Sequence, residues 1–267
     1  MLALRILTAA LAAPIVLAVV VVGSLPYLIM VMLAAGYGSY ELLAMLRKVE
    51  FAPFGALTIG LAVALPALGW WGGVSLDLLA ILLATVAALA LAVRGASSRG
   101  PADWALTIAA AILIGGLLRC LVELRQRPDG IWWVLAVLLG TWACDTAAYA
   151  VGRLLGRTPL APKVSPKKTV EGSIGAMAFT PLALVGVSVF APVVGLVSPL
   201  SIVMSLVLGL LIALAAMLGD LAESLIKRQC GVKDSGTLLP GHGGLLDRID
   251  GLLFAGLAGY GVSLVVR

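Results

Sequence analysis

Long apolar segments recur along the whole chain of 267 residues and restrict the folds that it can adopt. Hydrophobic residues make up 62% of the sequence and charged residues only 12%, and the mean hydropathy is +1.14. A soluble domain is about half apolar and about a quarter charged, whereas a membrane-spanning helix needs about 20 mostly apolar residues. The sequence therefore predicts an all-α, polytopic integral membrane protein.

Breaks that carry glycine, proline and charge divide the apolar sequence into about nine expected transmembrane helices. Their approximate spans are 6–22, 26–46, 54–69, 76–93, 104–121, 131–151, 173–195, 200–226 and 245–266. The first span is longer than the apolar part of a signal peptide and is followed closely by another, so we interpret it as a membrane helix. We expect an N-terminal region, 1–130, with about five helices and a C-terminal catalytic region, 131–267, with about four.

Lysine and arginine are distributed unevenly between the two sides that these helices define, and this bias predicts the orientation. With the N-terminus in the cytoplasm, 14 of the 18 basic residues lie in cytoplasmic segments and four lie outside. Three of the exceptions are Arg119, Arg125 and Arg127. The two most polar loops, 152–172 and 227–244, then both face the cytoplasm. We expect a multi-pass protein of the cell inner (cytoplasmic) membrane, in contact with the lipid bilayer.

Thiol and imidazole groups are few, which limits the metal chemistry that the chain can support. Cys120, Cys144 and Cys230 are scattered without a CxxC pair, a pattern that argues against a disulfide framework and favours buried packing residues. His242 is the single histidine, and zinc sites draw on several nitrogen and sulfur ligands. A metal ion in this protein should be a hard cation with oxygen ligands, such as Mg²⁺.

Charge is concentrated near the C-terminus, where nine of the 31 charged residues fall between Asp220 and Asp250. Insertion scales assign about 2.5–3.5 kcal/mol to each ionised residue at the centre of a membrane helix, so such residues lie near the surface, face a polar cavity or neutralise one another. An ion-pair ladder at the membrane surface is the structural alternative to a binding site. Five residues of this segment are spaced so that they lie on one face of a helix: Asp220, Glu223, Ser224, Lys227 and Arg228.

The loop that follows is rich in glycine and leads into the last expected helix. Such residues permit tight turns and close approach of the backbone to a ligand. Asp247 and Asp250 lie three residues apart at the start of that helix, with Arg248 between them, and a helix start favours anions. The loop and the charged residues together could hold a metal-bound phosphate. Its turn-forming residues are Gly236, Pro240, Gly241, Gly243 and Gly244.

A second polar region follows an apolar span that contains Asp145. A carboxylate inside the membrane indicates a functional site by default, with a buried, hydrogen-bonded aspartate as the alternative. In the segment SPKKTVEGS, the order Ser165–Pro166 is typical of a helix N-cap with proline at the first helical position. Lys167, Lys168 and Thr169 could bind phosphate, although an ordinary basic cytoplasmic loop explains the lysines equally well.

Carboxylates able to hold Mg²⁺ and cations able to hold phosphates favour phosphoryl or nucleotidyl transfer, in which catalysis is mostly positioning and charge neutralisation. The sequence contains neither a GxSxG nucleophile elbow nor a GxxxxGK[ST] phosphate loop. A transporter or flippase of an anionic lipid or nucleotide would also need charge in the membrane, but it would predict related halves, and no internal repeat is evident. A membrane phosphotransferase that uses a CDP-activated lipid is a further alternative, whose usual aspartate-rich pattern is absent.

Residues 224–250 resemble the C-terminal signature of the phosphatidate cytidylyltransferase (CDP-diacylglycerol synthase) family. That signature runs Ser-x-x-Lys-Arg, four residues, Lys-Asp, a small residue two further on, then Pro-x-His-Gly-Gly-x-x-Asp-Arg-x-Asp. SPKKTVEGS resembles a second family segment, with Val170 where many members carry tryptophan. The resemblance covers about 145–250. The matching signature residues are Ser224, Lys227, Arg228, Lys233, Asp234, Gly236, Pro240, His242, Gly243, Gly244, Asp247, Arg248 and Asp250.

The resemblance implies a membrane enzyme that converts CTP and phosphatidate to CDP-diacylglycerol and pyrophosphate with Mg²⁺. It also implies a homodimer and no nucleic-acid partner. Asp220 and Asp247 are the leading predicted metal ligands, supported by Asp145, Glu223 and Asp250. The predicted phosphate-binding cations are Lys167, Lys168, Lys227, Arg228 and Arg248, and Lys233 is a further predicted substrate contact. Ser165, Thr169 and Ser224 could donate hydrogen bonds, and His242 is expected to shape the loop or touch phosphate.

Overall fold

The computed structural model of the protein describes residues 2–71, 74–95, 99–238 and 243–266. Within these ranges the chain forms helices at all nine expected positions, so the predicted all-α architecture is confirmed. Seven helices, counted over the described residues, are long and apolar enough to cross a membrane. The chain is a multi-pass membrane protein. The number of crossings and the cytoplasmic N-terminus stay predictions.

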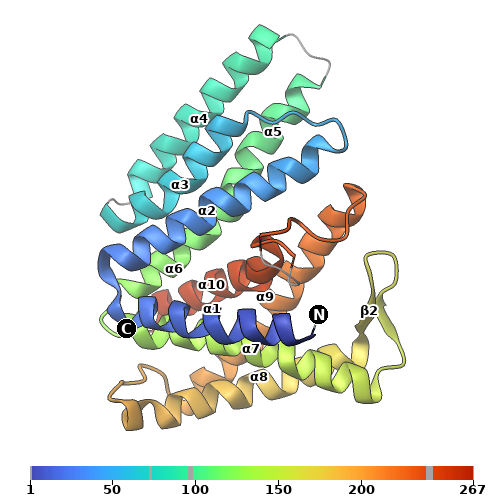
Figure 1. Ribbon diagram of the computed structural model, residues 1–267. Helices are drawn as coiled ribbons and strands as arrows, with labels where there is room; N and C mark the ends of the chain where they lie inside the picture. The colour runs from blue at the N-terminus through green and yellow to red at the C-terminus, as the bar shows by residue number, and fades with distance from the viewer. Residues whose placement is uncertain (1, 72–73, 96–98, 239–242, 267) are drawn as a thin grey trace. The chain divides into compact units, whose positions relative to one another are not determined.

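The first half of the chain contains α1 (Leu2–Val22), α2 (Ser24–Arg47), α3 (Gly55–Trp71), α4 (Val74–Gly95), α5 (Gly100–Ala111) and α6 (Leu117–Arg125). A π-helical turn, Ile112–Gly116, joins α5 to α6 in one continuous helix, where the sequence predicted a span over 104–121. The second half contains α7 (Gly130–Leu155), β1 (Pro159–Ala161), β2 (Ser165–Thr169), α8 (Val170–Phe190), α9 (Ile202–Gln229) and α10 (Leu246–Val265). Figure 1 shows this order from blue to red.

The described residues form two compact units, each made of two segments of the chain. The first unit contains Met1–Glu123 and Gln229–Arg248, and the second contains Leu124–Arg228 and Ile249–Arg267. The functional boundary that the sequence predicts near residue 130 stays a prediction.

Small residues allow close helix packing in the first unit. Leu61, Ala62 and Leu65 of α3 form a core with Ala84 and Ala111. A Cβ atom at Gly115 would lie 2.3 Å from the carbonyl oxygen of Ala62, so only glycine permits this approach between α3 and the π-helical turn. The Tyr27 hydroxyl donates a hydrogen bond of 3.0 Å to the carbonyl oxygen of Leu121, which fixes α2 against α6.

In the second unit, α7 and α8 pack along each other and are joined by the β1–β2 hairpin (Figure 1). The hairpin is antiparallel, and its register pairs Pro159 with Thr169 and Ala161 with Ser165. Glycine again sets the helix spacing: a Cβ atom at Gly209 of α9 would lie 2.4 Å from the Cα atom of Pro181 in α8. This packing positions the polar end of α9 described below.

Candidate functional site

Asp220 of α9 and Asp250 of α10 lie at a close contact between these two helices in the second unit. A Cβ atom at Gly219 would lie 2.4 Å from the carbonyl oxygen of Asp250, so the two backbones meet beside Asp220. The charge of the Asp220 carboxylate acts on the Asp250 carboxyl group. Two carboxylates that share a site repel each other unless a cation compensates them. This pair is therefore a place where the second unit attracts positive charge.

Lys168 of strand β2 supplies one such charge. Its Nζ atom forms an ion pair with the Asp220 carboxylate at 2.5 Å, and both side chains are partly buried, at 25% and 38% exposure. The Ser224 hydroxyl donates a 3.4 Å hydrogen bond to the other oxygen of Asp220. Lys168 and Ser224, which come from two separately predicted polar segments, thus both contact the Asp220 carboxylate.

Further along the same face of α9, Glu223 and Lys227 form a buried ion pair at 2.5 Å. The Lys227 charge also acts on Asp250. Arg228 is exposed, and its Nε–H donates to the carbonyl oxygen of Val164 in the hairpin turn at 3.2 Å. The Glu223–Lys227 pair is an ion pair of the kind that the structural alternative describes. A binding role for Asp220 on the same face stays a prediction.

The structure corrects the N-cap predicted at Ser165–Pro166. These residues belong to strand β2, and α8 begins at Val170 with Thr169 as its N-cap. The Thr169 hydroxyl oxygen accepts a 3.1 Å hydrogen bond from the Gly172 amide, as N-cap threonines do. The prediction was wrong because Pro166 also fits an isolated two-stranded ribbon, in which a missing N–H costs little. The expected phosphate contacts of Ser165 and Thr169 stay predictions.

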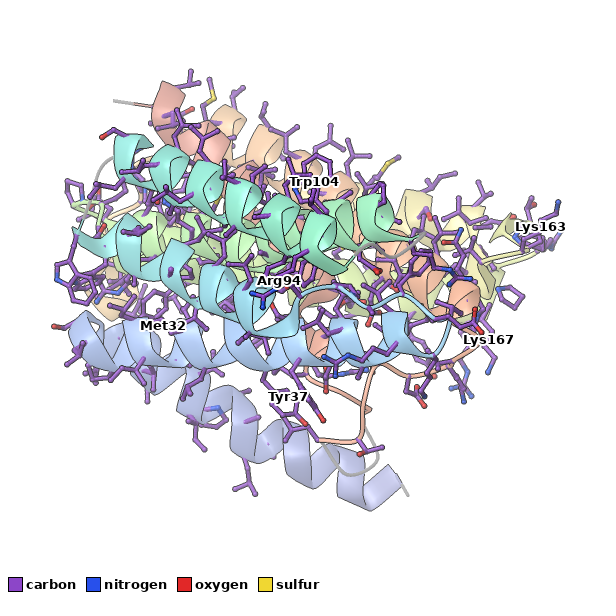
Figure 2. All side chains as sticks on the ribbon, turned by 90° about the horizontal axis from the view of Figure 1, so that it is seen from above. Met32, Tyr37, Arg94, Trp104, Lys163 and Lys167 are labelled. Carbon is purple, nitrogen blue, oxygen red and sulfur yellow. The ribbon has the colours of Figure 1, made fainter. Side chains whose placement is uncertain are left out.

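The two lysines of β2 differ in their surroundings. Lys168 is held by Asp220, whereas Lys167 is exposed on the adjacent position of the strand. Lys163 lies at the turn of the β1–β2 hairpin. Figure 2 labels Lys163 and Lys167, the two exposed lysines of this hairpin. Strand geometry explains the difference, because successive side chains of a strand point to opposite faces.

Asp247 lies in the first unit, at the start of α10, and is held by the loop that precedes it. Its Oδ2 atom accepts hydrogen bonds from the Ser235 amide at 2.9 Å, the Ser235 hydroxyl at 3.0 Å and the Gly244 amide at 2.8 Å. Gly243 has a φ of 84°, a conformation that favours glycine. Ser235 and Gly244 therefore both bind one oxygen of the predicted metal ligand.

Four further predicted residues complete the comparison with the sequence. Asp145 lies on α7 and is exposed, within reach of the Cys144 thiol, on which its charge acts. Lys233 and Arg248 are exposed in the first unit. His242 lies outside the described residues. No ligand role predicted for these side chains is tested by the structure.

Glu41 of α2 is a polar residue that the sequence interpretation did not select. It is only 2% exposed and accepts hydrogen bonds from Ser235, Leu245 and Leu246 in the loop that holds Asp247. The signal was present in the sequence, because Glu41 is a carboxylate inside the expected span 26–46. The rule that singled out Asp145 applies equally to Glu41.

The oxygen donors around Asp220 suit a hard cation. Among the described residues, no three His, Cys, Asp or Glu side chains are grouped so that they could hold a metal ion by themselves. Mg²⁺ is usually bound by one or two carboxylates together with water and substrate phosphates, so the Asp220–Asp250 pair meets its requirement. The Lys168 ammonium group already contacts one oxygen of Asp220.

The fold and these residues define an α-helical, multi-pass membrane protein with paired carboxylates and lysines on α9, α10 and β2. The sequence profile of the cytidylyltransferase family matches residues 3–265. The chain belongs to the cytidylyltransferase family.

Named relatives come from several bacteria. The phosphatidate cytidylyltransferase of Bacillus subtilis is 34% identical over 255 residues, which cover 94% of this chain and 93% of the relative. The phosphatidate cytidylyltransferase of Brucella melitensis is 48% identical over 132 residues, covering 49% of this chain and 46% of the relative. That of Synechocystis is 45% identical over 143 residues, covering 52% and 46%.

Proposed function

We propose that this chain is a phosphatidate cytidylyltransferase, which transfers CMP from CTP to phosphatidate and forms CDP-diacylglycerol and pyrophosphate. Membership of the cytidylyltransferase family and the names of its relatives support this function. The structural observation that carries the proposal is the Asp220–Asp250 carboxylate pair with Lys168 bound to it. The group places carboxylates and an ammonium group next to each other. Nucleotidyl transfer between two anions needs such charged groups, because catalysis consists mainly of positioning the anions and stabilising their charge.

In the reaction, a phosphate oxygen of phosphatidate attacks the α-phosphorus of CTP. A bond forms between that oxygen and the phosphorus, and the bond from the phosphorus to the oxygen shared with the β-phosphate breaks. The electron pair leaves with pyrophosphate. A phosphate monoester has a second pKa of about 6 and is mostly dianionic at pH 7, so the nucleophile needs no general base. The task of the protein is to bring two anions together and to stabilise the leaving group.

Basic side chains of the second unit are suited to that task. Lys168 can exchange its partner Asp220 for a phosphate oxygen, because both are oxygen anions within reach of a flexible ammonium group. Arg228 and Lys167 are exposed at the polar end of α9 and β2, and we assign both to phosphate binding. Lys227 is held by Glu223, so we assign it to charge balance near Asp250 as well as to phosphate binding.

Asp220 and Asp250 would hold Mg²⁺, and the ligand roles predicted for Asp247, Asp145 and Glu223 remain part of the proposal. Bound Mg²⁺ supplies charge neutralisation at the phosphate oxygens and stabilises the pyrophosphate leaving group. We further propose a location in the cell inner membrane, where phosphatidate is accessible from the bilayer, and a homodimeric state. Family membership favours this enzyme over the transporter and over the other phosphotransferase considered from the sequence.

The protein purified in detergent and supplied with phosphatidate and Mg²⁺ tests the function directly. We expect pyrophosphate release from CTP, with CDP-diacylglycerol as the lipid product, and little release from ATP, GTP or UTP. Removal of Mg²⁺ with a chelator should abolish the release. Folded protein that releases pyrophosphate from none of the four nucleotides would refute the proposal, and lipid transport would then be measured.

The role of Asp220 is tested by Asp220→Asn, which keeps the shape of the side chain and removes its charge. Loss of a group that acts on developing charge lowers kcat by about 10²- to 10³-fold, and we expect a loss of this order. Asp129→Asn is the matched control, since Asp129 precedes α7 in the same unit and makes no side-chain capping bond. Equal turnover of the two variants would show that Asp220 does not serve the reaction.

A further inference from the structure

Glu41 stands out among the buried groups because it lies in the second helix of the chain, yet its side chain accepts hydrogen bonds from residues near the C-terminus. It belongs to α2, about two turns before the end of the helix at Arg47. Its partners are separated from it by about 200 positions: Ser235 by 194, Leu245 by 204 and Leu246 by 205. All of these residues are members of the first unit.

Three donors face the two oxygens of this carboxylate. Oε1 accepts from the Leu245 amide at 3.0 Å, and Oε2 accepts from the Leu246 amide at 2.8 Å and the Ser235 hydroxyl at 3.0 Å. A convergence of donors suits an ionised, acceptor-only carboxylate. Hydrogen bonds to a charged group are stronger than those between neutral groups, and the start of a helix favours negative charge. Glu41 therefore fixes the first residues of α10.

The glycines of the loop make room for this carboxylate. A Cβ atom at Gly236 would lie 2.3 Å from Oε1 of Glu41, and one at Gly244 would lie 2.4 Å from the same oxygen. From the sequence we expected these glycines to permit close approach to a bound phosphate. In the structure they permit close approach to an internal carboxylate, and the amides of Leu245 and Leu246 are used by Glu41.

Ser235 connects Glu41 to Asp247. Its hydroxyl lies 3.0 Å from Oε2 of Glu41 and 3.0 Å from Oδ2 of Asp247. A serine hydroxyl has one hydrogen to donate, so the two carboxylates share one donor. Because the Ser235 amide also donates to Asp247, any shift of Ser235 moves the Asp247 side chain.

We propose that Glu41 is a positioning residue: it holds Ser235, Leu245 and Leu246 in place and so sets the orientation of the Asp247 carboxylate. The inference rests on the proposed function in so far as Asp247 is a metal ligand of the transferase. Ordering of the loop itself does not depend on that function. Glu41 acts through Ser235 and the α10 backbone and touches no reacting atom.

The first test is hydrogen–deuterium exchange of Glu41→Gln in detergent, without nucleotide. Glutamine has the size of glutamate but presents an NH₂ donor toward backbone amides. Loss of hydrogen bonds to a charged group corresponds to about tenfold to hundredfold faster exchange, and we expect this increase in peptides that contain Leu245 and Leu246. Glu50→Gln is the matched control, because Glu50 is in the same unit, 81% exposed and paired with Arg99. Exchange equal to that of the control would overturn the proposal.

The second test separates positioning from simple structural support. In the pyrophosphate assay, Glu41→Gln should raise the Mg²⁺ concentration for half-maximal activity about tenfold, the effect expected when an outer hydrogen-bond partner of a ligand is lost. The KM for CTP should change much less. Faster loop exchange with an unchanged Mg²⁺ requirement would overturn the positioning role. If the wild-type protein released no pyrophosphate, the proposed function would be refuted. The hydrogen-exchange experiment would still test whether Glu41 holds Leu245 and Leu246 in place.

If Glu41→Gln does not fold, Ser235→Ala can be used instead in both the exchange and the Mg²⁺ experiments. This variant removes only the shared hydroxyl and leaves the amide donors in place. We expect a smaller increase in exchange around Leu246 and a smaller rise in the Mg²⁺ requirement, of about threefold to tenfold for one neutral hydrogen bond. No change in either quantity would contradict the proposed path from Glu41 through Ser235 to Asp247.

Discussion

Lys167 and Lys168 are adjacent in strand β2, but only Lys168 forms an ion pair with Asp220. Substitution of each lysine by methionine therefore distinguishes two effects on activity: the loss of a positive charge from the strand, and the loss of the ion pair with Asp220. Lys168→Met leaves Asp220 without its ion-pair partner, and we expect kcat/KM to fall about 10²-fold. Lys167→Met removes an exposed charge worth about 1 kcal/mol in water, which corresponds to about fivefold.

Steady-state kinetics with CTP at fixed phosphatidate would measure both changes. Thermal unfolding in detergent is the control, because it shows whether either variant has lost its fold. Equal losses of activity in two folded variants would contradict the special role of Lys168.

Candidate site residues could be selected from the sequence where a charged residue lies in an apolar segment. The spacing of α9 was sufficient to select Asp220, and its pairing with Lys168 joins two segments that were selected separately. Glu41 was not predicted because it is isolated in the sequence of its helix, whereas most of the predicted site residues lie in clusters of charge. Its partners are mainly backbone amides, which a sequence does not distinguish from any others.

The contact between α9 and α10 depends on Gly219. A Cβ atom there would lie 2.4 Å from the carbonyl oxygen of Asp250 and 2.8 Å from the ring of Phe254. We expect Gly219→Ala to force the helices apart, destabilise the protein by about 1–3 kcal/mol as overpacking does, and reduce turnover by displacing Asp220 from Asp250.

Gly186→Ala in α8 is the matched control for Gly219→Ala, because a Cβ atom at Gly186 meets no atom within 4 Å. Alanine is favoured over glycine in a helix by about 1 kcal/mol, so this control should be neutral or slightly stabilising. Thermal unfolding of both variants measures the difference. A stable, active Gly219→Ala variant would show that the close approach of α9 and α10 is not needed.

Elements were predictable in proportion to their length and apolar content. The helices follow from long hydrophobic segments, with ends that differ by a few residues, such as 200–226 expected and Ile202–Gln229 found for α9. The β1–β2 hairpin was not predicted, because three- and five-residue strands leave too short a pattern. The proline that suggested a helix start at Ser165 instead lies in the hairpin, and Thr169 caps the helix that begins at Val170.

At the scale of the whole molecule, Arg119 explains part of an irregularity in the charge distribution. It was one of the basic residues that the predicted orientation placed outside. In the structure it is mostly buried and forms ion pairs with Asp77 and Glu123, each at 2.5 Å. Arg119 also lies within helix α6 and not in a loop, and the orientation rule counts basic residues mainly in loops. The predicted cytoplasmic N-terminus does not depend on it.

Labelling of single cysteines on the two sides of the membrane tests this orientation. Lys163→Cys, at the exposed turn of the hairpin, is predicted to face the cytoplasm, and Pro128→Cys, in the exposed turn between α6 and α7, the opposite side. A membrane-impermeant maleimide should label only Pro128→Cys in intact spheroplasts, and Lys163→Cys should react after lysis. The reverse pattern would invert the topology and place the hairpin lysines away from cytoplasmic CTP.

The native thiols should not obscure this measurement. Cys120, Cys144 and Cys230 are all buried. Burial raises the pKa of the Cys230 thiol, the one that lies outside the helices, although Lys48 partly opposes the shift. A raised thiol pKa means less thiolate at pH 7, and the thiolate is the species that reacts with maleimide. The unsubstituted chain should therefore remain unlabelled at pH 7 in either preparation, and signal from it would require the cysteines to be replaced before the topology is assigned.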